Sequence, residues 1–183
     1  MRVRVPSVLL YSNPRNLKVN IFALDIDPEQ AAAWHCDSHV VKMTLESAQI
    51  LSVVNRLAGR TDGIYKMTHK NNPHVKWVME STENYKWLWR LGINLAVEFY
   101  QRYGHVHRSR AVLELVKIPP HNVPVGKLTK FYQNMPEKYR QPNPIWAYRN
   151  FYKFEKNKGK LGTWKRNRPW WWDLDSFTEE FNF

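Results

Sequence analysis

The sequence predicts an all-α protein, a compact helical bundle with a short extended arm near its N-terminus and a long proline-rich loop. Three observations support this class: apolar residues recur at helical spacing over long stretches, helix-capping residues flank those stretches, and no internal repeat or second domain is evident. Hydrophobic residues make up 43% of the 183 residues, which is enough for one core. We therefore expect residues 19–183 to form one helical domain.

Residues 1–18 are expected to be a non-native or disordered extension. The stretch RVRVPS can be back-translated to resemble the T-arm of a transfer-RNA gene, and Val19 can be encoded by GTG, an alternative bacterial start codon. We expect the native chain to begin at residue 19, with Met in that position. Residues 19–27, VNIFALDID, then read as a short strand or extended arm.

The first helix is predicted over about 28–58. Asp27 suits the N-cap, Pro28 the first helical position and Gln30 the third position of a capping box, while Gly59 is a natural terminator. At about 100° per residue, one polar stripe of this helix carries His35, His39, Lys42, Glu46 and Gln49.

Asp37 is the exception, because its angle points toward the apolar side of the same helix. A carboxylate that faces a core needs a partner or a chemical task. Two interpretations of the stripe stay open. Lys42 and Glu46 are either an ordinary surface pair beside solvated histidines, or Glu46 is kept among cations because it does chemistry.

The rest of the chain also reads as helical. Asn72 caps a region over 73–103 that is expected to break at Ser81–Thr82 and to end at Gly104. A short helix follows over 108–117. Residues 118–144 are rich in proline and are expected to lack regular structure. A last helix over 145–157 is expected to pack across the others.

The charge balance favours a polyanion as partner, and duplex DNA is the first candidate. The net charge is +12, from 28 basic and 16 acidic residues, and the pI is near 9.9. Aromatic side chains beside cations suit base stacking. The alternative is a solvated basic surface with no specific partner. The expected DNA contacts are Lys66, Lys70, Lys153, Lys156, Lys160, Trp164, Lys165, Arg166, Arg168 and Trp170.

Several function classes are disfavoured by what the sequence lacks. One cysteine excludes an internal disulfide and fits a reducing cytoplasm. No apolar run approaches the roughly 18 residues that span a bilayer. Neither a phosphate-binding glycine loop nor a GxSxG elbow occurs, so nucleotide hydrolysis and acyl transfer are disfavoured, and no cofactor is expected. His35 and His39 stand four residues apart and leave a metal site open as an alternative, with Cys36 or Asp37 nearby.

Asp37, His39 and Glu46 form the pattern D-x-H-x6-E on the first helix, and this pattern resembles the phage pyrimidine-dimer DNA glycosylase/AP lyase family, the phage endonuclease V family. The stretch KNNPHVKWVMESTENYKWLWRL is similar to that family's second helical region. IWAYRNFYKF and GTWKRNRPWWW are loosely similar to its aromatic and basic end. The pattern NIF.LD.DP..AA...CD.HVVKM.LE.AQ.L also resembles a group of uncharacterised phage proteins.

The resemblance implies an imine mechanism on damaged pyrimidines in duplex DNA. In that family a neutral amine attacks C1′ and displaces the base, and β-elimination then cuts the strand. Glu46 would stabilise the cationic sugar and handle the proton, with His39 two turns before it. The family's amine is the N-terminal α-amino group, whereas here the numbered terminus lies 45 residues before Glu46.

The amine therefore has two expected sources. A start at Val19 brings the terminus closer, and because methionine is poorly removed before Asn20, the nucleophile could be that retained methionine. Lys42, one turn from Glu46, is the substitute. Two further functions stay open. The chain could be a non-enzymatic DNA- or RNA-binding protein, or a metal-dependent nuclease or nucleotide-modifying enzyme that uses His35, Asp37 and His39.

Overall fold

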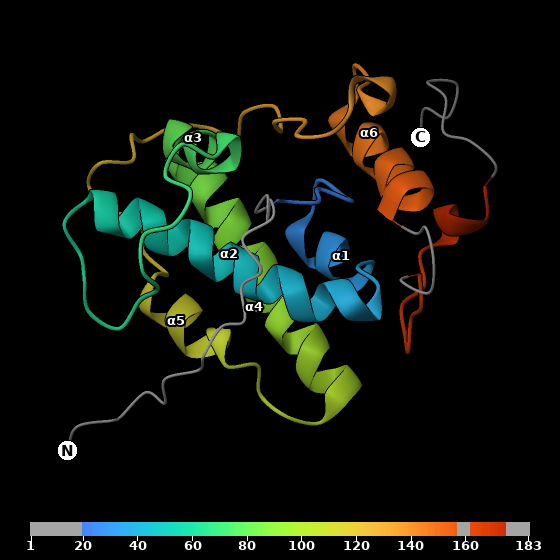
Figure 1. Ribbon diagram of the computed structural model, residues 1–183, viewed down its shortest axis with the longest axis horizontal. Coiled ribbons are helices and arrows are strands. Elements are labelled where there is room, and N and C mark those ends of the chain that lie inside the picture. The colour runs from blue at the N-terminus through green and yellow to red at the C-terminus, as the bar shows by residue number, and fades with distance from the viewer. Residues whose placement is uncertain (1–19, 157–161, 175–183) are drawn as a thin grey trace.

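The computed structural model describes residues 20–156 and 162–174, and it confirms the all-α class (Figure 1). The predicted extension over residues 1–18 lies outside the described residues. None of the described residues forms a strand, and none of the described helices is long and apolar enough to cross a membrane. The α-helices are α1 Pro28–Ala33, α2 Asp37–Leu57, α3 Pro73–Glu80, α4 Thr82–Tyr103, α5 Ser109–Leu115 and α6 Pro144–Phe151.

The two long helices, α2 and α4, cross at the centre of the molecule, and α1, α3 and α5 pack around them (Figure 1). The last helix, α6, was expected to pack across the others, but its main helical contacts are with the turns Glu137–Tyr139 and Tyr152–Lys156. Leu51 of α2 and Leu88 and Leu91 of α4 are fully buried between them. Gly92 permits the close approach. A Cβ there would lie 3.0 Å from the Ser47 Cβ and 2.9 Å from a Leu113 methyl group, so any side chain would push α2 and α5 away from α4.

The single first helix predicted over 28–58 is wrong, because the chain breaks between Ala33 and Asp37. Cys36 is extended, with φ −67° and ψ 162°. Its N–H donates to the Tyr152 hydroxyl at 2.9 Å, and the Asp37 N–H donates to the Thr163 carbonyl at 2.8 Å. Partners far along the chain thus take donors that a continuous helix would have bonded internally.

Several predicted boundaries are confirmed. Asp27 caps α1, accepting from the main-chain N–H groups of Glu29 and Gln30. The expected break at Ser81 separates α3 from α4, and the Ser81 hydroxyl accepts from the Asn84 N–H at 3.1 Å.

Further along, Gly104 ends α4 in the left-handed region with φ 75°. The loop over 118–144 is irregular except for one 3₁₀ turn, Glu137–Tyr139. The last helix begins at Pro144 rather than 145, and only Pro144–Phe151 is α-helical, because Tyr152–Lys156 form a π turn.

The extended arm is confirmed, as buried coil rather than a strand. Residues Ile21 to Leu24 are each at most 2% exposed. The Leu24 carbonyl accepts a 2.8 Å hydrogen bond from Arg149 Nε of α6, and the same guanidinium pairs with Asp25 at 3.0 Å. The arm is therefore fixed between the long helices and α6.

The core-facing carboxylate of Asp37 has its partner in Arg102 of α4. Arg102 Nη1 lies 3.1 Å from Asp37 Oδ1, and Nη2 lies 2.9 Å from Glu98 Oε2. The same guanidinium donates to the carbonyls of Ala33 at 2.9 Å and His35 at 2.8 Å. Arg102 thus joins the end of α1, the break and the start of α2, and this contact explains the position of Asp37 without a catalytic role.

Replacing Arg102 with Met should lower the free energy of unfolding by about 3–5 kcal/mol, because two largely buried carboxylates would lose their counter-charge. Urea unfolding followed by circular dichroism measures this. Lys86→Met is the matched control on the same helix. It breaks the exposed Lys86–Glu83 pair and should cost below about 1 kcal/mol. Equal losses for the two variants would contradict the role given to Arg102.

Candidate functional site

Glu46 lies at the middle of α2 and points toward the extended arm. Its Oε2 accepts from the main-chain N–H of Asn20 at 2.9 Å, and its Oε1 lies 3.3 Å from Lys42 Nζ. The Glu46 side chain is 7% exposed and the Lys42 side chain is 47% exposed. Because the carboxylate is buried, this is not the ordinary surface pair that one interpretation of the sequence offered.

Asn20 also connects the arm to α3. Its Oδ1 lies 2.6 Å from His74 Nε2, and it accepts the N–H of Ile21 at 2.9 Å. Since an amide oxygen can only accept, the contact assigns the proton of His74 to Nε2. Burial lowers the pKa of His74 to about 3, so this imidazole is neutral at neutral pH.

His39 lies two turns before Glu46 and is packed rather than solvated. It is 7% exposed, its ring stacks on Phe22 with centroids 5.2 Å apart, and it meets the Tyr152 ring edge-on at 5.0 Å. A packed imidazole beside the arm restricts where the arm can lie. We call Asn20, His39, Lys42, Glu46 and His74 the Glu46 cluster.

The break before α2 separates His35 from the predicted stripe. His35 is fully buried, its Nδ1 lies 2.6 Å from the Ala31 carbonyl, and burial lowers its pKa to about 4. His35 Nδ1 is bonded to the Ala31 carbonyl, and Asp37 is paired with Arg102. These two proposed metal donors therefore have protein partners. The described residues contain no group of three or more His, Cys, Asp or Glu side chains placed to hold a metal ion.

A basic loop lies beside the next turn of α2. Lys66 and Lys70 are exposed on the segment between α2 and α3, and Thr68 and His69 of that segment share a small hollow with Gln49. Gln49 is three residues after Glu46, so two of the predicted DNA-contacting lysines belong to a loop that packs next to the Glu46 cluster.

Four of the C-terminal cations that are predicted to contact DNA also have partners within the molecule. Lys165 Nζ lies 4.3 Å from the centroid of the Tyr103 ring, Arg166 approaches Glu98 at 3.9 Å, and Arg168 pairs with Asp173. Lys153 donates to the Leu174 carbonyl. Lys160 and the side chain of Lys156 lie outside the described residues.

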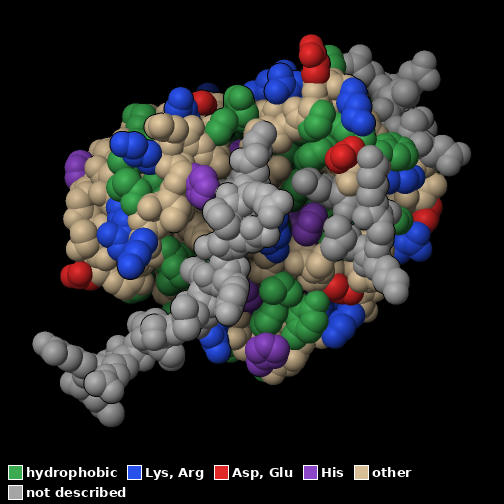
Figure 2. All heavy atoms as spheres, in the orientation of Figure 1, with side chains coloured by type: hydrophobic (Ala, Val, Ile, Leu, Met, Phe, Trp, Pro, Cys, Tyr) green, Lys and Arg blue, Asp and Glu red, His purple; other side chains and the backbone are tan. Residues whose placement is uncertain are grey.

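The two predicted DNA-contacting tryptophans differ in exposure. Trp164 is half-buried and donates to the Trp34 carbonyl at 3.0 Å, whereas Trp170 is 56% exposed. The segment 162–174 packs around the first residue of α2, and Glu46 lies about 14 Å further along that helix. Figure 2 shows Lys and Arg side chains in separate groups over the visible face rather than in one band.

Sequence reasoning missed Asn20, His74, Arg102 and Tyr152. The apolar-facing carboxylate of Asp37 was the signal for a buried cation such as Arg102. His74 follows the cap residue Asn72 and Pro73, and was interpreted only as part of a helix start. Nothing in the local sequence could have indicated that Tyr152 contacts Cys36, because 116 residues separate them.

Comparisons of the chain with protein-family models, with curated proteins and with solved structures give no match. The function proposed below therefore rests on the geometry of the Glu46 cluster.

Acid should destabilise the fold through His35 and His74. Both are neutral when buried, with pKa values of about 4 and about 3, against 6.5 in the unfolded chain. The unfolded chain thus binds more protons between these values. The free energy of unfolding should keep this contribution in full above pH 6.5. It should fall as the pH drops toward 4, by up to about 1.4 kcal/mol per pH unit for each histidine.

Urea unfolding at pH 7.5, 6, 5 and 4.5 measures this dependence. The His35→Gln variant should show a shallower slope than the parent chain, and His121→Gln, at an exposed histidine, is the matched control. A parent stability that stays level from pH 7 to 4.5 would contradict the burial of two neutral imidazoles.

Proposed function

We propose that this protein is a DNA glycosylase/AP lyase that acts on damaged pyrimidines in duplex DNA through an imine. The observation that carries the proposal is the 2.9 Å contact between the main-chain nitrogen of Asn20 and Oε2 of Glu46. In the 183-residue chain this nitrogen is an amide. In a chain that starts at Asn20, the same nitrogen is an α-amino group with a pKa of about 8, a suitable nucleophile.

The chemistry follows from the pair of groups. Glu46 accepts a proton from the amine, whose lone pair then attacks C1′ of the damaged nucleotide. The bond from C1′ to the base breaks, and the base leaves with the electron pair and takes up the proton that Glu46 received, which returns Glu46 to its carboxylate form. Loss of a second amine proton and opening of the sugar give the imine, and removal of a C2′ proton expels the 3′ phosphate. The buried carboxylate offsets the positive charge of the iminium.

Lys42 offers a second amine at the same carboxylate. Its Nζ lies 3.3 Å from Glu46 Oε1, and its half-exposed side chain can reach a bound strand. A methionine retained at position 19 would place the α-amino group one residue before Asn20, about 3.8 Å from the main-chain nitrogen of Asn20. Glu46 is thus the common group, whichever amine forms the imine.

Duplex DNA is the proposed partner. The net charge of +12 supports it, as do the exposed Lys66 and Lys70 next to the Glu46 cluster. Extruding a nucleotide costs roughly a few kcal/mol, and phosphate contacts from the basic loop would offset that cost.

One observation favours a non-enzymatic DNA-binding protein as a second candidate. Both carboxylate oxygens of Glu46 already have partners, Asn20 and Lys42, so the cluster can act solely to hold the arm. In that case the charge alone would bind DNA and no covalent step would occur.

The amine can be identified by reduction of the imine. A chain released from a fusion so that it begins at Asn20 should form a borohydride-trapped adduct with a UV-irradiated duplex, and the 183-residue chain should form far less. Lys42→Ala in the Asn20 chain should keep the adduct. Loss of the adduct in Lys42→Ala would move the nucleophile to Lys42, and absence of an adduct in every chain would leave the DNA-binding function.

Glu46→Gln should abolish strand cleavage and keep or improve DNA binding. Glutamine keeps the shape and the hydrogen bond from Asn20, but it can neither take the proton nor offset a cationic sugar. Cleavage assays and binding titrations on the same duplex separate the two effects. Glu114→Gln, at an exposed pair with Arg110, is the control and should cleave normally. An active Glu46→Gln protein would remove the proposed mechanism.

DNA binding should depend steeply on salt, with part of the slope due to the basic loop. Lys66→Ala combined with Lys70→Ala should reduce the slope of log K against log salt by about 2, since each phosphate contact contributes about 0.9. Fluorescence anisotropy at several salt concentrations gives the slope. The pair Lys117→Ala and Lys138→Ala removes equal exposed charge elsewhere and should change it less. Equal effects would show that only total charge matters.

A further inference from the structure

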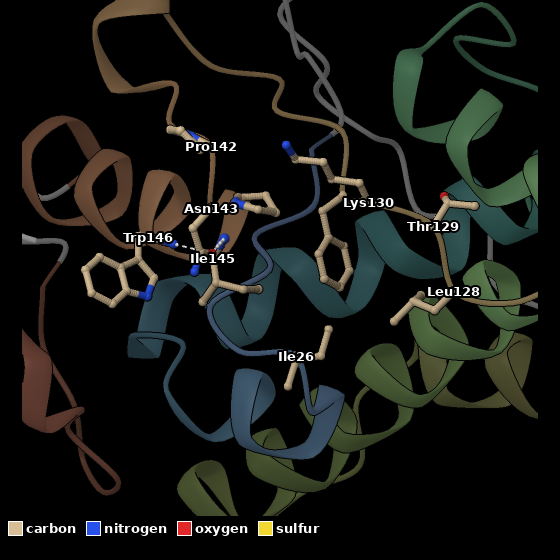
Figure 3. A pocket seen from close by; sticks show the side chains of 10 residues that line it. Ile26, Leu128, Thr129, Lys130, Pro142, Asn143, Ile145 and Trp146 are labelled. Atoms are coloured by element: carbon tan, nitrogen blue, oxygen red, sulfur yellow. Dashed lines mark hydrogen bonds between the residues drawn. The ribbon is translucent and has the colours of Figure 1, made fainter. Parts of the chain in front are cut away.

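A pocket of about 760 Å³ opens between the start of α6 and the irregular loop (Figure 3). One wall comes from Leu128 to Phe131 and the opposite wall from Pro142 to Trp146, with Ile26 of the arm between them. None of these residues belongs to the Glu46 cluster, so this is a second site. Its volume lies in the range of small-molecule sites, about 300–1,000 Å³.

The walls are preformed. Phe131 is 6% exposed, and its ring is held by Trp87, with centroids 4.7 Å apart, and by Trp77 at 5.3 Å. On the other side, the Asn143 side chain caps α6 by accepting from the N–H of Ile145 at 3.0 Å. Ile145 and Trp146 are therefore held on a helix that faces a fixed aromatic ring. Such a slot between apolar walls suits a flat ring.

The rim of the pocket is positive. Lys130 is exposed, and within the described part of the chain it forms no ion pair. Among the described residues, no carboxylate lines the pocket. Glu80 approaches only through the Thr129 hydroxyl, which donates to it at 2.7 Å. A ligand with a flat aromatic part and an anionic group would fit the apolar slot and the lysine together.

We propose that this pocket binds a nucleotide, with its base between Phe131 and Ile145 and its phosphate at Lys130. The proposal goes beyond the glycosylase function, because it requires neither a free amine nor bond cleavage. A free mononucleotide and a nucleotide within a DNA strand present the same base and phosphate, so both are sources of this ligand.

Isothermal titration calorimetry with the full chain tests the proposal. Thymidine monophosphate should bind, thymidine should bind about fivefold more weakly, and inorganic phosphate should give no saturable heat. Lys130→Ala should weaken the monophosphate about fivefold and leave thymidine unchanged. Lys127→Ala removes an exposed charge three residues earlier, outside the pocket, and should change neither.

Ile26→Trp tests the apolar part. Ile26 is 60% exposed, so a larger side chain there should fill the pocket without unfolding the protein, which circular dichroism checks. The monophosphate should lose at least about tenfold in affinity, the effect of about 1.4 kcal/mol. The proposal is overturned if the monophosphate does not bind the parent chain, if Ile26→Trp binds it unchanged, or if phosphate alone binds equally well.

A short oligothymidylate identifies the source. If the oligonucleotide also loses affinity in Ile26→Trp, the pocket takes a nucleotide of a strand, and if only the monophosphate does, it takes the free nucleotide. Occupying the pocket requires neither cleavage of these ligands nor formation of an imine. The glycosylase proposal can thus fail while the pocket holds, and the reverse.

Discussion

The buried guanidinium of Arg102 determines where the first long helix begins. It neutralises Asp37 and Glu98 and at the same time donates hydrogen bonds to the carbonyl groups of Ala33 and His35. A continuous helix would need those carbonyls for its own ladder. The break between α1 and α2 is therefore stabilised by a tertiary contact, and the orientation of α2, which carries Glu46, depends on it.

The break also positions the arm and the Glu46 cluster. The chain before α1 runs back along α2 as the arm, and Asn20 comes to lie between Glu46 and His74. The arm is covered on one side by His39, which stacks on Phe22 of the arm, and on the other by α6, where Arg149 holds Leu24 and Asp25. The Glu46 cluster thus joins three elements that are distant in sequence, and a carboxylate that would be solvated on an isolated helix becomes buried next to a main-chain nitrogen.

Local signals in the sequence predicted much of the fold. Asp27, Asn72, Ser81 and Gly104 mark helix ends through hydrogen bonds to their immediate neighbours, and such signals can be read from a short window. The break at Cys36 could not be read in this way, because its donors pair with Tyr152 and Thr163, more than 100 residues away.

The same distinction between local signals and tertiary contacts applies to the candidate site. His39, Lys42 and Glu46 share one helix and were predicted together. Asn20 and His74 join them only through tertiary contacts, and neither has a pattern that marks it. The C-terminal cations show the same limit: a run of Lys and Arg predicts affinity for phosphate, but the contacts of Arg166 with Glu98 and of Lys165 with Tyr103 cannot be read from that run.

The arm and α6 are far apart in the sequence, so the ribosome synthesises them at different times. Leu24 bonds to Arg149, 125 residues later. At about 5–20 residues per second, the ribosome needs roughly 6–25 seconds to synthesise the part of the chain that separates them. During that interval Ile21 to Leu24 have no α6 to cover them, so the nascent chain exposes an apolar, extended segment of the kind that chaperones bind.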